Sequence, residues 1–320
     1  MSRQSIPTAS TTVSVPWPEG RRFAFTVFDD PDSQSLECSQ AVYGLLADLG
    51  FRTTKGVWPL GPTRKPSDHG LTCADATYRA HVQELQARGF EIGFHNATSH
   101  TSTREETEAG LKRFREYFGE GAITMSNHYN SEEGIYFGSA RVSSWNRALY
   151  DGLTLGRNRQ AYRGHVPGDP RFWGDFCQQH IRYVRNFAFL NINTLAECPH
   201  MPYHDTDRPF VRAWYASSVG ANAERFLSLL SEENQDRLEA EGGASIVYTH
   251  FAHGFFGENG LTARFRELMT RLALKNGWFV PVGTLLDFLE QNRGLHRISA
   301  AERGRMERKW LWEKIRTGTN

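Results

Sequence analysis

The chain has few cysteines for its 320 residues, and their spacing does not point to a shared site. Only four occur, widely separated and without a Cys-x-x-Cys motif; they are Cys38, Cys73, Cys177 and Cys198. This distribution argues against a cysteine-based metal site and is typical of a reduced, cytosolic protein.

The chain also lacks an excess of charge of one sign, and it lacks long apolar runs. Lys and Arg together number 37 and Asp and Glu 36, so no overall field favours a nucleic-acid partner. No run approaches the roughly 18 apolar residues that a transmembrane helix needs. Residues 1–20 are rich in Ser, Thr and Pro without the apolar core of a secretory signal, so we expect an N-terminal tail, either loose or strapped across the bottom of the fold. We therefore expect a cytoplasmic protein without a transmembrane segment.

Nucleotide-binding motifs are missing as well. No Gly-x-Gly-x-x-Gly follows the first predicted strand, and no Gly-x-x-x-x-Gly-Lys-Ser/Thr occurs. Strands are predicted from apolar and β-branched runs at 23–28, 52–60, 90–94, 122–125, 245–249 and 279–282. Helices are predicted at 33–49, 74–88, 103–118 and 285–291. This alternation predicts an α/β fold with a parallel sheet and helical crossovers. We interpret it as a closed or nearly closed barrel, with an open doubly wound sheet as the alternative.

The barrel is predicted to span 21–294, with additions at its face and at its end. The stretch 138–220 is irregular and aromatic, and we predict long loops there that elaborate one face. Residues 295–320 predict a basic amphipathic helix that begins with the capping box Ser299-Ala-Ala-Glu302. Docking of this helix on the barrel is the expected arrangement. Peripheral contact with the inner face of the membrane is the alternative.

Polar side chains follow four of the predicted strands. They are Asp29 and Asp30 after 23–28, His95 after 90–94, Asn127 and His128 after 122–125, and His250 after 245–249. Because the carboxyl ends of barrel strands face one mouth, we expect these side chains to lie close together. One aspartate with two histidines is a common set for a catalytic divalent metal, and it leaves a position open for water.

Asp30 and His95 are the expected metal ligands. The third ligand stays open between His100, which lies five residues after His95, and His128. Zinc is the expected ion for this set, with cobalt, nickel, manganese or iron as alternatives. The candidates for contact with substrate are Asn96, Asn127, Asn130 and Arg163.

Thr26-Val-Phe-Asp-Asp30 resembles the Thr-Phe-Asp-Asp motif of the polysaccharide deacetylase superfamily, the NodB-like carbohydrate esterases of family 4. The resemblance implies a distorted (β/α) barrel of seven strands, with long loops on its C-terminal face and here a C-terminal helix. It also implies that Asp29 is the general base and Asp30 a metal ligand. Ile246-Val-Tyr-Thr-His250 matches the last motif of the family, whose histidine is the general acid.

Two departures from the family pattern indicate a divergent branch. The family has a His-x-x-x-His pair of ligands, whereas His95 and His100 are one residue further apart. The family's Arg-x-Pro motif is missing, and Ser126-Asn-His-Tyr-Asn130 stands in its place. Arg163 is therefore the candidate for the group that steers the base. The middle block and the C-terminal segment are similar to deacetylases of O-antigen and surface-polysaccharide clusters, the WbmS type.

The function that this resemblance implies is metal-dependent N-deacetylation of an N-acetylated sugar in surface-polysaccharide biosynthesis. A metal-activated water would attack the acetyl group, Asp29 would take its proton, and His250 would protonate the departing amine. Two alternatives remain open. One is another metal-dependent hydrolysis, such as O-deacetylation or amide cleavage on a non-sugar. The other is a barrel that has lost catalysis and binds glycan.

Overall fold

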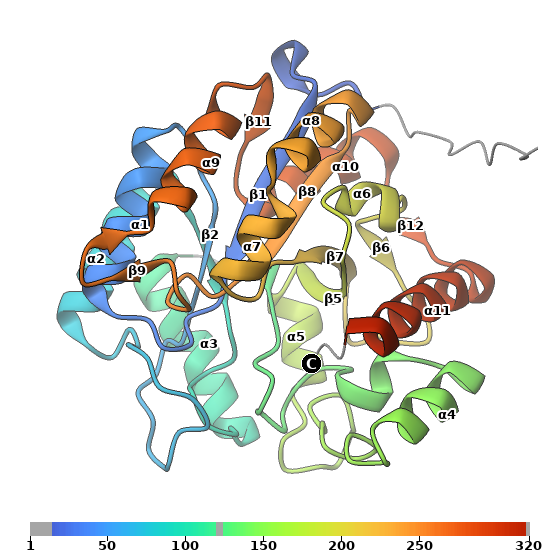
Figure 1. Ribbon diagram of the computed structural model, residues 1–320. Helices are drawn as coiled ribbons and strands as arrows, with labels where there is room; N and C mark the ends of the chain where they lie inside the picture. The colour runs from blue at the N-terminus through green and yellow to red at the C-terminus, as the bar shows by residue number, and fades with distance from the viewer. Residues whose placement is uncertain (1–14, 120–123, 318–320) are drawn as a thin grey trace, which may run out of the picture.

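Seven parallel strands close into a barrel in the computed structural model, which describes residues 15–119 and 124–317 (Figure 1). In order around the barrel they are β1 (Phe23–Asp29), β2 (Thr54–Val57), β3 (Glu91–Phe94), β4 (Thr124–Met125), β5 (Tyr183–Phe189), β7 (Ala213–Val219) and β8 (Ala244–Thr249). β8 pairs with β1 over six residues and closes the ring. The predicted seven-stranded (β/α) barrel is confirmed.

The sequence of β1 explains why this strand lies at the centre of the fold. All seven of its residues are buried, as expected for a parallel strand covered on both faces. Phe23, Phe25 and Val27 pack in one hydrophobic cluster with apolar side chains of the outer helices. Ala24 and Phe28 alternate with them and belong to a second cluster, which includes side chains from the other barrel strands.

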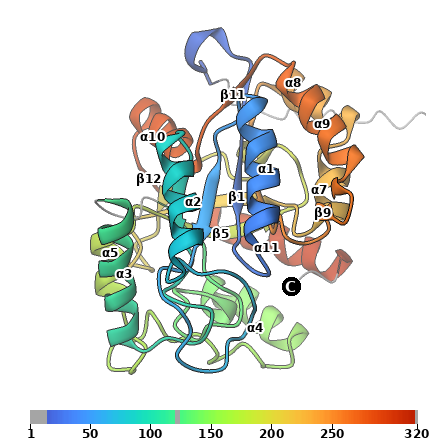
Figure 2. The same ribbon diagram turned by 90° about the vertical axis from the view of Figure 1, so that its left-hand side faces the viewer.

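Helices surround the barrel on its outside (Figures 1 and 2). They are α1 (Leu36–Asp48), α2 (Ala76–Ala87), α3 (Arg104–Phe118), α5 (Gly174–His180), α6 (Thr194–Glu197), α7 (Ala223–Leu229), α8 (Glu232–Glu241), α9 (Ala263–Ala273) and α10 (Val282–Arg293). The first three begin at capping side chains, Ser35, Asp75 and Thr103, each of which accepts a hydrogen bond from a backbone N–H of the first turn. These caps fix the residue at which each helix begins after its loop at the barrel mouth.

Short elements extend the sheet outside the barrel. β11 (Gly277–Phe279) pairs with the first half of β1, and β6 (Tyr203–His204) joins β7 to β12 (His296–Arg297). A hairpin is formed by β9 (Phe256–Gly257) and β10 (Gly260–Leu261). The remaining pieces are η1 (Pro18–Gly20), η2 (Gly138–Arg141) and α4 (Ser144–Leu153), and the last two lie with long loops at the lower end of the barrel in Figure 1.

Two sequence-based predictions need correction, and a third falls partly outside the described residues. The stretch 138–220 was predicted as loops, but it contains the barrel strands β5 and β7. Polar residues such as Arg185 and Ser217 interrupt the apolar pattern of these strands, and they do so because they hydrogen-bond inside the barrel. The strand predicted at 279–282 ends at Phe279, and α10 begins at Val282. Of the strand predicted at 122–125, the structure describes Thr124 and Met125, and residues 122 and 123 lie outside the described residues.

Residues 1–14 of the predicted tail also lie outside the described residues, whereas Trp17 is tied to the barrel. Its indole Nε1–H donates to the carbonyl of Gly242 at 2.9 Å, and its ring packs on Trp278 and Phe288. This end of the tail therefore packs across the end of the barrel at which the strands begin, opposite the strand ends that hold the predicted site.

The C-terminal helix α11 (Ala300–Thr317) docks on β5 and α4, as expected (Figure 1). The capping box at Ser299 and Glu302 is formed, with distances of 2.8 and 3.3 Å for its two backbone hydrogen bonds. Trp310 is buried on the barrel, while Trp312 and Ile315 are exposed. None of the helices in the described segments has the length and apolarity that crossing a bilayer requires.

Replacing Gly110 of α3 with alanine should destabilise the protein. The added Cβ would lie 2.5 Å from Cβ and 3.0 Å from Cα of Ala97, which is closer than these atoms can approach. Overpacking of this kind costs typically about 1–3 kcal/mol. Gly44 of α1 is the matched control, because nothing lies within 4 Å of its added Cβ, and Gly44→Ala should stabilise by about 0.5–1 kcal/mol. Urea unfolding measures both, and equal effects would contradict the packing of α3 on the segment after His95.

Candidate metal centre

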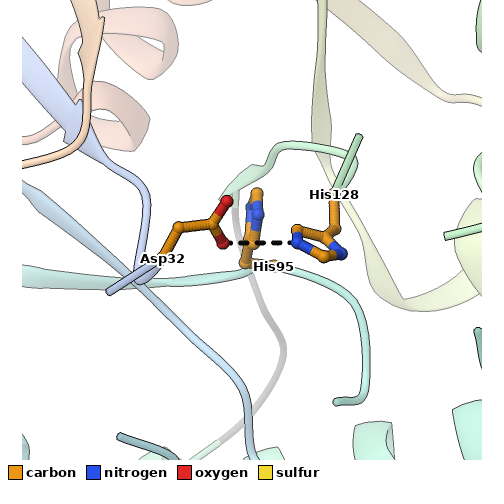
Figure 3. Close-up of side chains that lie close together, drawn as sticks. All are labelled: Asp32, His95 and His128. Atoms are coloured by element: carbon orange, nitrogen blue, oxygen red, sulfur yellow. Dashed lines mark ion pairs between the residues drawn. The ribbon is translucent and has the colours of Figure 1, made fainter. Parts of the chain in front are cut away.

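The loops at the carboxyl ends of β1, β3 and β4 bring three side chains together that are far apart in the sequence. The ligand atoms of Asp32, His95 and His128 all lie within 4.8 Å of one another. Both histidines are buried, and the Asp32 side chain is 13% exposed with its Oδ1 buried. Figure 3 shows the Asp32 carboxylate facing the two imidazole rings, with a distance of 3.3 Å between its Oδ1 and His128 Nε2. His95 and His128 come from the strand ends at which the sequence predicted them.

The polar atoms that converge at this point lack hydrogen bonds of good geometry. Asp32 Oδ1, His95 Nε2 and His128 Nε2 are buried, and none meets hydrogen-bond geometry within the described part of the chain. Each lies at ion-pair distance instead: His95 Nε2 is 3.0 Å from Asp30 Oδ2, and His128 Nε2 is 3.3 Å from Asp32 Oδ1 and 3.1 Å from Asp68 Oδ2. Buried polar atoms are almost always in well-formed hydrogen bonds, so carboxylates and imidazole nitrogens packed in this way call for a shared ligand. A carboxylate oxygen with two imidazole nitrogens is a donor set that zinc and similar divalent ions prefer. These three residues therefore fit a metal ion.

The loop after β4 orients the His128 ring for this role. His128 Nδ1 lies 2.9 Å from the hydroxyl of Ser131, which leaves Nε2 to face Asp32. The backbone N–H of His128 donates to Asn96 Oδ1 at 3.1 Å, and Asn96 in turn donates to Glu133 at 2.6 Å. Groups that hold a ligand histidine in this way raise its affinity for metal. Asn96, predicted to contact substrate, is 1% exposed and positions His128 instead.

Asp30 forms a second group beside the first, together with His250. Asp30 Oδ2 lies 3.0 Å from His95 Nε2 and 3.4 Å from His250 Nε2, and it accepts a hydrogen bond from the hydroxyl of Tyr248. The backbone N–H of Asp32 donates to the other oxygen of Asp30 at 3.0 Å. Asp30, Asp32 and His250 also bring their ligand atoms within 4.8 Å of one another. Asp68 Oδ2 lies 3.1 Å from His128 Nε2 as well, so three carboxylates pair with three histidines at this site.

The carboxylates of Asp30 and Asp32 repel each other. Burial and the negative charge of Asp30 raise the pKa of Asp32 to about 7. Burial alone would raise the pKa of Asp30 too, but the adjacent His95 and His250 hold it well below its usual range. Burial lowers the pKa of His250, whereas Asp30 raises it, and the result is about 9. A divalent cation would favour the charged form of both carboxylates and remove the conflict.

Asp29 does not face this cluster. It is fully buried, and its Oδ2 accepts hydrogen bonds from Lys55 Nζ at 2.7 Å and from the Tyr43 hydroxyl at 3.0 Å. Its Oδ1 accepts from the backbone N–H of Phe251 at 3.0 Å. Strand alternation explains this position, because Asp29 continues the side of β1 that packs under the outer helices. The sequence-based role of general base therefore does not fit Asp29, since both of its oxygens are engaged away from the mouth.

The remaining predicted residues have partners that separate them from the cluster. His100 Nδ1 bonds to the carbonyl of Thr101 at 2.9 Å, and its Nε2 accepts from the N–H of Thr63 at 3.1 Å, so both ring nitrogens are used. The structure thus brings His128 to the other ligands, and not His100. Arg163 pairs with Asp169 at 3.0 Å rather than reaching a base.

Two predicted asparagines do line the cavity that opens over the cluster. Asn127 is nearly buried, and both ends of its amide bond to the backbone of Ile135. Asn130 is exposed and donates to Asp68 at 3.3 Å. The cavity measures about 440 Å³, and its walls come from β5, β8, η2, α7 and α11. Asn130 is therefore the predicted substrate contact that remains most accessible.

Sequence reasoning missed three residues of the site. Asp32 lies two residues after Asp30, and an Asp-x-Asp spacing was the signal that could have revealed it. Tyr248 belongs to the motif that ends in His250. Arg185 lies in the stretch predicted as loops; its guanidinium carbon is 3.6 Å from the centre of the Tyr248 ring, and its Nε donates to Ser126 at 2.9 Å. Tyr248 and Arg185 lie beside the Asp30 carboxylate. Arg163, which the sequence offered as the group that steers the base, does not.

Comparison with known proteins supports the fold. No family model and no curated protein matches the chain. A crystal structure of a candidate polysaccharide deacetylase from Mycobacterium smegmatis superposes with a TM-score of 0.52 at 12% identity, covering 90% of this chain and 96% of that one. The chain has the fold of a polysaccharide deacetylase. The sequence resemblance to the NodB-like superfamily is thus confirmed at the level of the fold.

Two further solved structures are similar over much of their length. The chitin deacetylase of the fungus Colletotrichum lindemuthianum has a TM-score of 0.39 at 14% identity, with 83% of this chain and 88% of that chain covered. A candidate polysaccharide deacetylase involved in O-antigen biosynthesis, from Bordetella bronchiseptica, has a TM-score of 0.37 at 14% identity, with coverage of 88% and 95%.

Lys55→Met should unfold the protein more easily, because it leaves the buried Asp29 carboxylate without its cation. Breaking a buried ion pair from one side costs about 3–5 kcal/mol. The double variant Lys55→Met/Asp29→Leu removes both charges and should recover part of that loss. Urea unfolding of the wild type and both variants measures the difference. A Lys55→Met protein as stable as the wild type would show that Asp29 is not held as described.

His128→Ala should lose its metal, while His100→Ala should keep it. His128 offers a buried, unbonded Nε2 to the cluster, whereas both ring nitrogens of His100 are engaged elsewhere. Loss of a ligand should weaken binding by more than the roughly 10–100-fold that loss of a supporting hydrogen bond costs. Elemental analysis and zinc titration of both folded variants make the comparison. Retention by His128→Ala together with loss by His100→Ala would reverse the assignment.

Proposed function

We propose that the protein is a metal-dependent deacetylase that hydrolyses the N-acetyl group of a sugar. Asp32, His95 and His128 hold the divalent ion, most simply zinc. The observation that carries this proposal is the convergence of their three buried ligand atoms, none in a hydrogen bond of good geometry, at the mouth of a barrel with the polysaccharide deacetylase fold. When bound, such an ion activates water and polarises a carbonyl oxygen.

Asp30 is the proposed general base. It lies beside the three ligands without being needed to complete them, and its Oδ2 faces His95 and His250. The Tyr248 hydroxyl, held under the guanidinium of Arg185, fixes the orientation of this carboxylate. Asp30 Oδ2 takes the proton of the water that attacks the acetyl carbon. This assignment moves the base one residue along the chain from Asp29.

His250 is the proposed general acid, in agreement with the sequence. Its Nδ1–H donates to the carbonyl of Ala221 at 2.7 Å, so the other ring nitrogen, Nε2, faces the site. Nε2 gives its proton to the departing amine nitrogen as the C–N bond breaks. The products are acetate and an amino sugar. Water supplies the oxygen and one proton of acetic acid and, through Asp30, the second proton. His250 gives one proton to the amine, and transfer of the proton from Asp30 to His250 restores both groups.

The setting that we propose is surface-polysaccharide biosynthesis in the cytoplasm. This setting follows from the resemblance noted in the sequence between the middle block and C-terminal segment and deacetylases of such clusters. The four buried cysteines, none of them in a disulfide, are in keeping with a reducing compartment.

Asp30→Asn should abolish most acetate release while metal binding is retained. Removing a general base costs typically about 100- to 10,000-fold in rate. The assay measures acetate from N-acetyl sugars and from O-acetyl sugars with the zinc-loaded protein. The control is Glu224→Gln, which neutralises an exposed acid on α7 and should leave the rate unchanged.

The outcome also separates the proposal from its alternatives. Release from O-acetyl sugars alone would make the protein an esterase. An Asp30→Asn protein as active as the wild type would remove Asp30 from the mechanism. Absence of release from every acetylated sugar tested, with metal bound, would contradict the deacetylase proposal.

A further inference from the structure

The cavity wall carries positive charge without matching carboxylates. Arg141 of η2, Arg185 of β5 and Arg225 of α7 line the cavity. Within the described residues, none of the three forms an ion pair with an aspartate or glutamate. Asp30, Asp32 and Asp68 line the same cavity, and they pair with histidines instead. The cavity therefore offers cations that have no carboxylate partner among the described residues.

Arg141 is the most unusual member of this wall. It is 8% exposed, and its Nε is buried without a hydrogen-bond partner among the described residues. Its guanidinium carbon lies 4.0 Å from the centre of the Phe137 ring and 5.1 Å from that of Trp310. These aromatic contacts satisfy the faces of the guanidinium, but its Nε–H points out along the plane and still needs an acceptor.

A buried cation with an unsatisfied donor is costly, so its retention needs a reason. Burial lowers the pKa of Arg141 to about 10, and the group therefore stays charged at neutral pH. Phe137 and Trp310 hold the guanidinium plane at the cavity wall, so a ligand would meet a donor fork that is already oriented. The planar fork matches a carboxylate or a phosphate, each of which can accept two parallel hydrogen bonds.

We infer that the acetylated sugar bears an anionic group, a carboxylate or a phosphate, and that Arg141 binds this group. The inference rests on the proposed function, because the acetyl group must then reach Asp30 and Asp32, which line the same cavity. A volume of about 440 Å³ falls within the usual range for a small-molecule site. The cavity can thus take one sugar together with its charged substituent.

Two sources can supply this chemistry. A phosphate would come from a sugar linked to a nucleotide or lipid diphosphate, and a carboxylate from an N-acetylated uronic acid. Arg141 would bind either through the same fork. Four probes therefore separate them: N-acetylglucosamine, its 1-phosphate, its uridine diphosphate conjugate and the N-acetylated uronic acid.

The test is calorimetric binding of these probes to the zinc-loaded protein. We expect at least one anionic probe to bind more than about 10-fold tighter than neutral N-acetylglucosamine. Arg141→Met keeps an apolar stem between Phe137 and Trp310, and it should reduce the ratio of anionic to neutral affinity by about 10- to 100-fold. Arg141→Lys keeps the charge and should retain part of the ratio, which guards against a Met variant that does not fold. Arg157→Met removes an exposed charge outside the cavity and should leave the ratio unchanged.

Equal affinity for neutral and anionic probes, or an equal loss for both in a folded Arg141 variant, would overturn the inference. Acetate release measured on the same samples separates it from the proposed function. Arg141-dependent anion binding without acetate would uphold the anion site and contradict the deacetylase. Acetate released at the same rate from neutral and anionic probes would uphold the deacetylase and overturn the anion site.

Discussion

The balance of buried negative charge at the mouth of the barrel is the constraint on which the site depends. Three carboxylates lie within the four residues from Asp29 to Asp32 at the end of β1, and each is neutralised differently. Asp29 has Lys55, Asp30 has the histidines and the Tyr248 hydroxyl, and Asp32 lacks a hydrogen bond to the oxygen that faces the cluster. The first is an ion pair of the core, the second fits a proton acceptor, and the third fits a metal ligand.

Neighbouring parts of the chain are arranged to serve this balance. Asn96 and Ser131 orient His128, and the carbonyl of Ala221 orients His250. Arg185 stacks on Tyr248 beside Asp30. The C-terminal helix contributes Trp310, which contacts Arg141 and closes the cavity wall. The helix that the sequence set apart as a C-terminal addition is therefore part of the site.

Much of this arrangement could be predicted from the sequence, because strand periodicity and strand-end residues are local signals. The apolar run that ends in two aspartates located β1, and His95, His128 and His250 were correctly placed at strand ends. Register at the strand end could not be predicted. Consecutive residues of a strand point to opposite sides, so Asp29 faces the outer helices and Asp30 faces the mouth. β5 and β7 were missed for a related reason, since their inward polar residues are hydrogen-bonded in the folded protein but interrupt an apolar pattern in the sequence.

The central claim is that Asp32, His95 and His128 hold a divalent metal ion. Its most direct test is an anomalous difference map from crystals of the zinc-loaded protein, collected on both sides of the zinc edge. The account predicts a peak about 2.0–2.2 Å from one Asp32 oxygen and from Nε2 of both histidines. Zinc bound by His100, or a map without a peak among these three side chains in crystals grown with excess zinc, would contradict it.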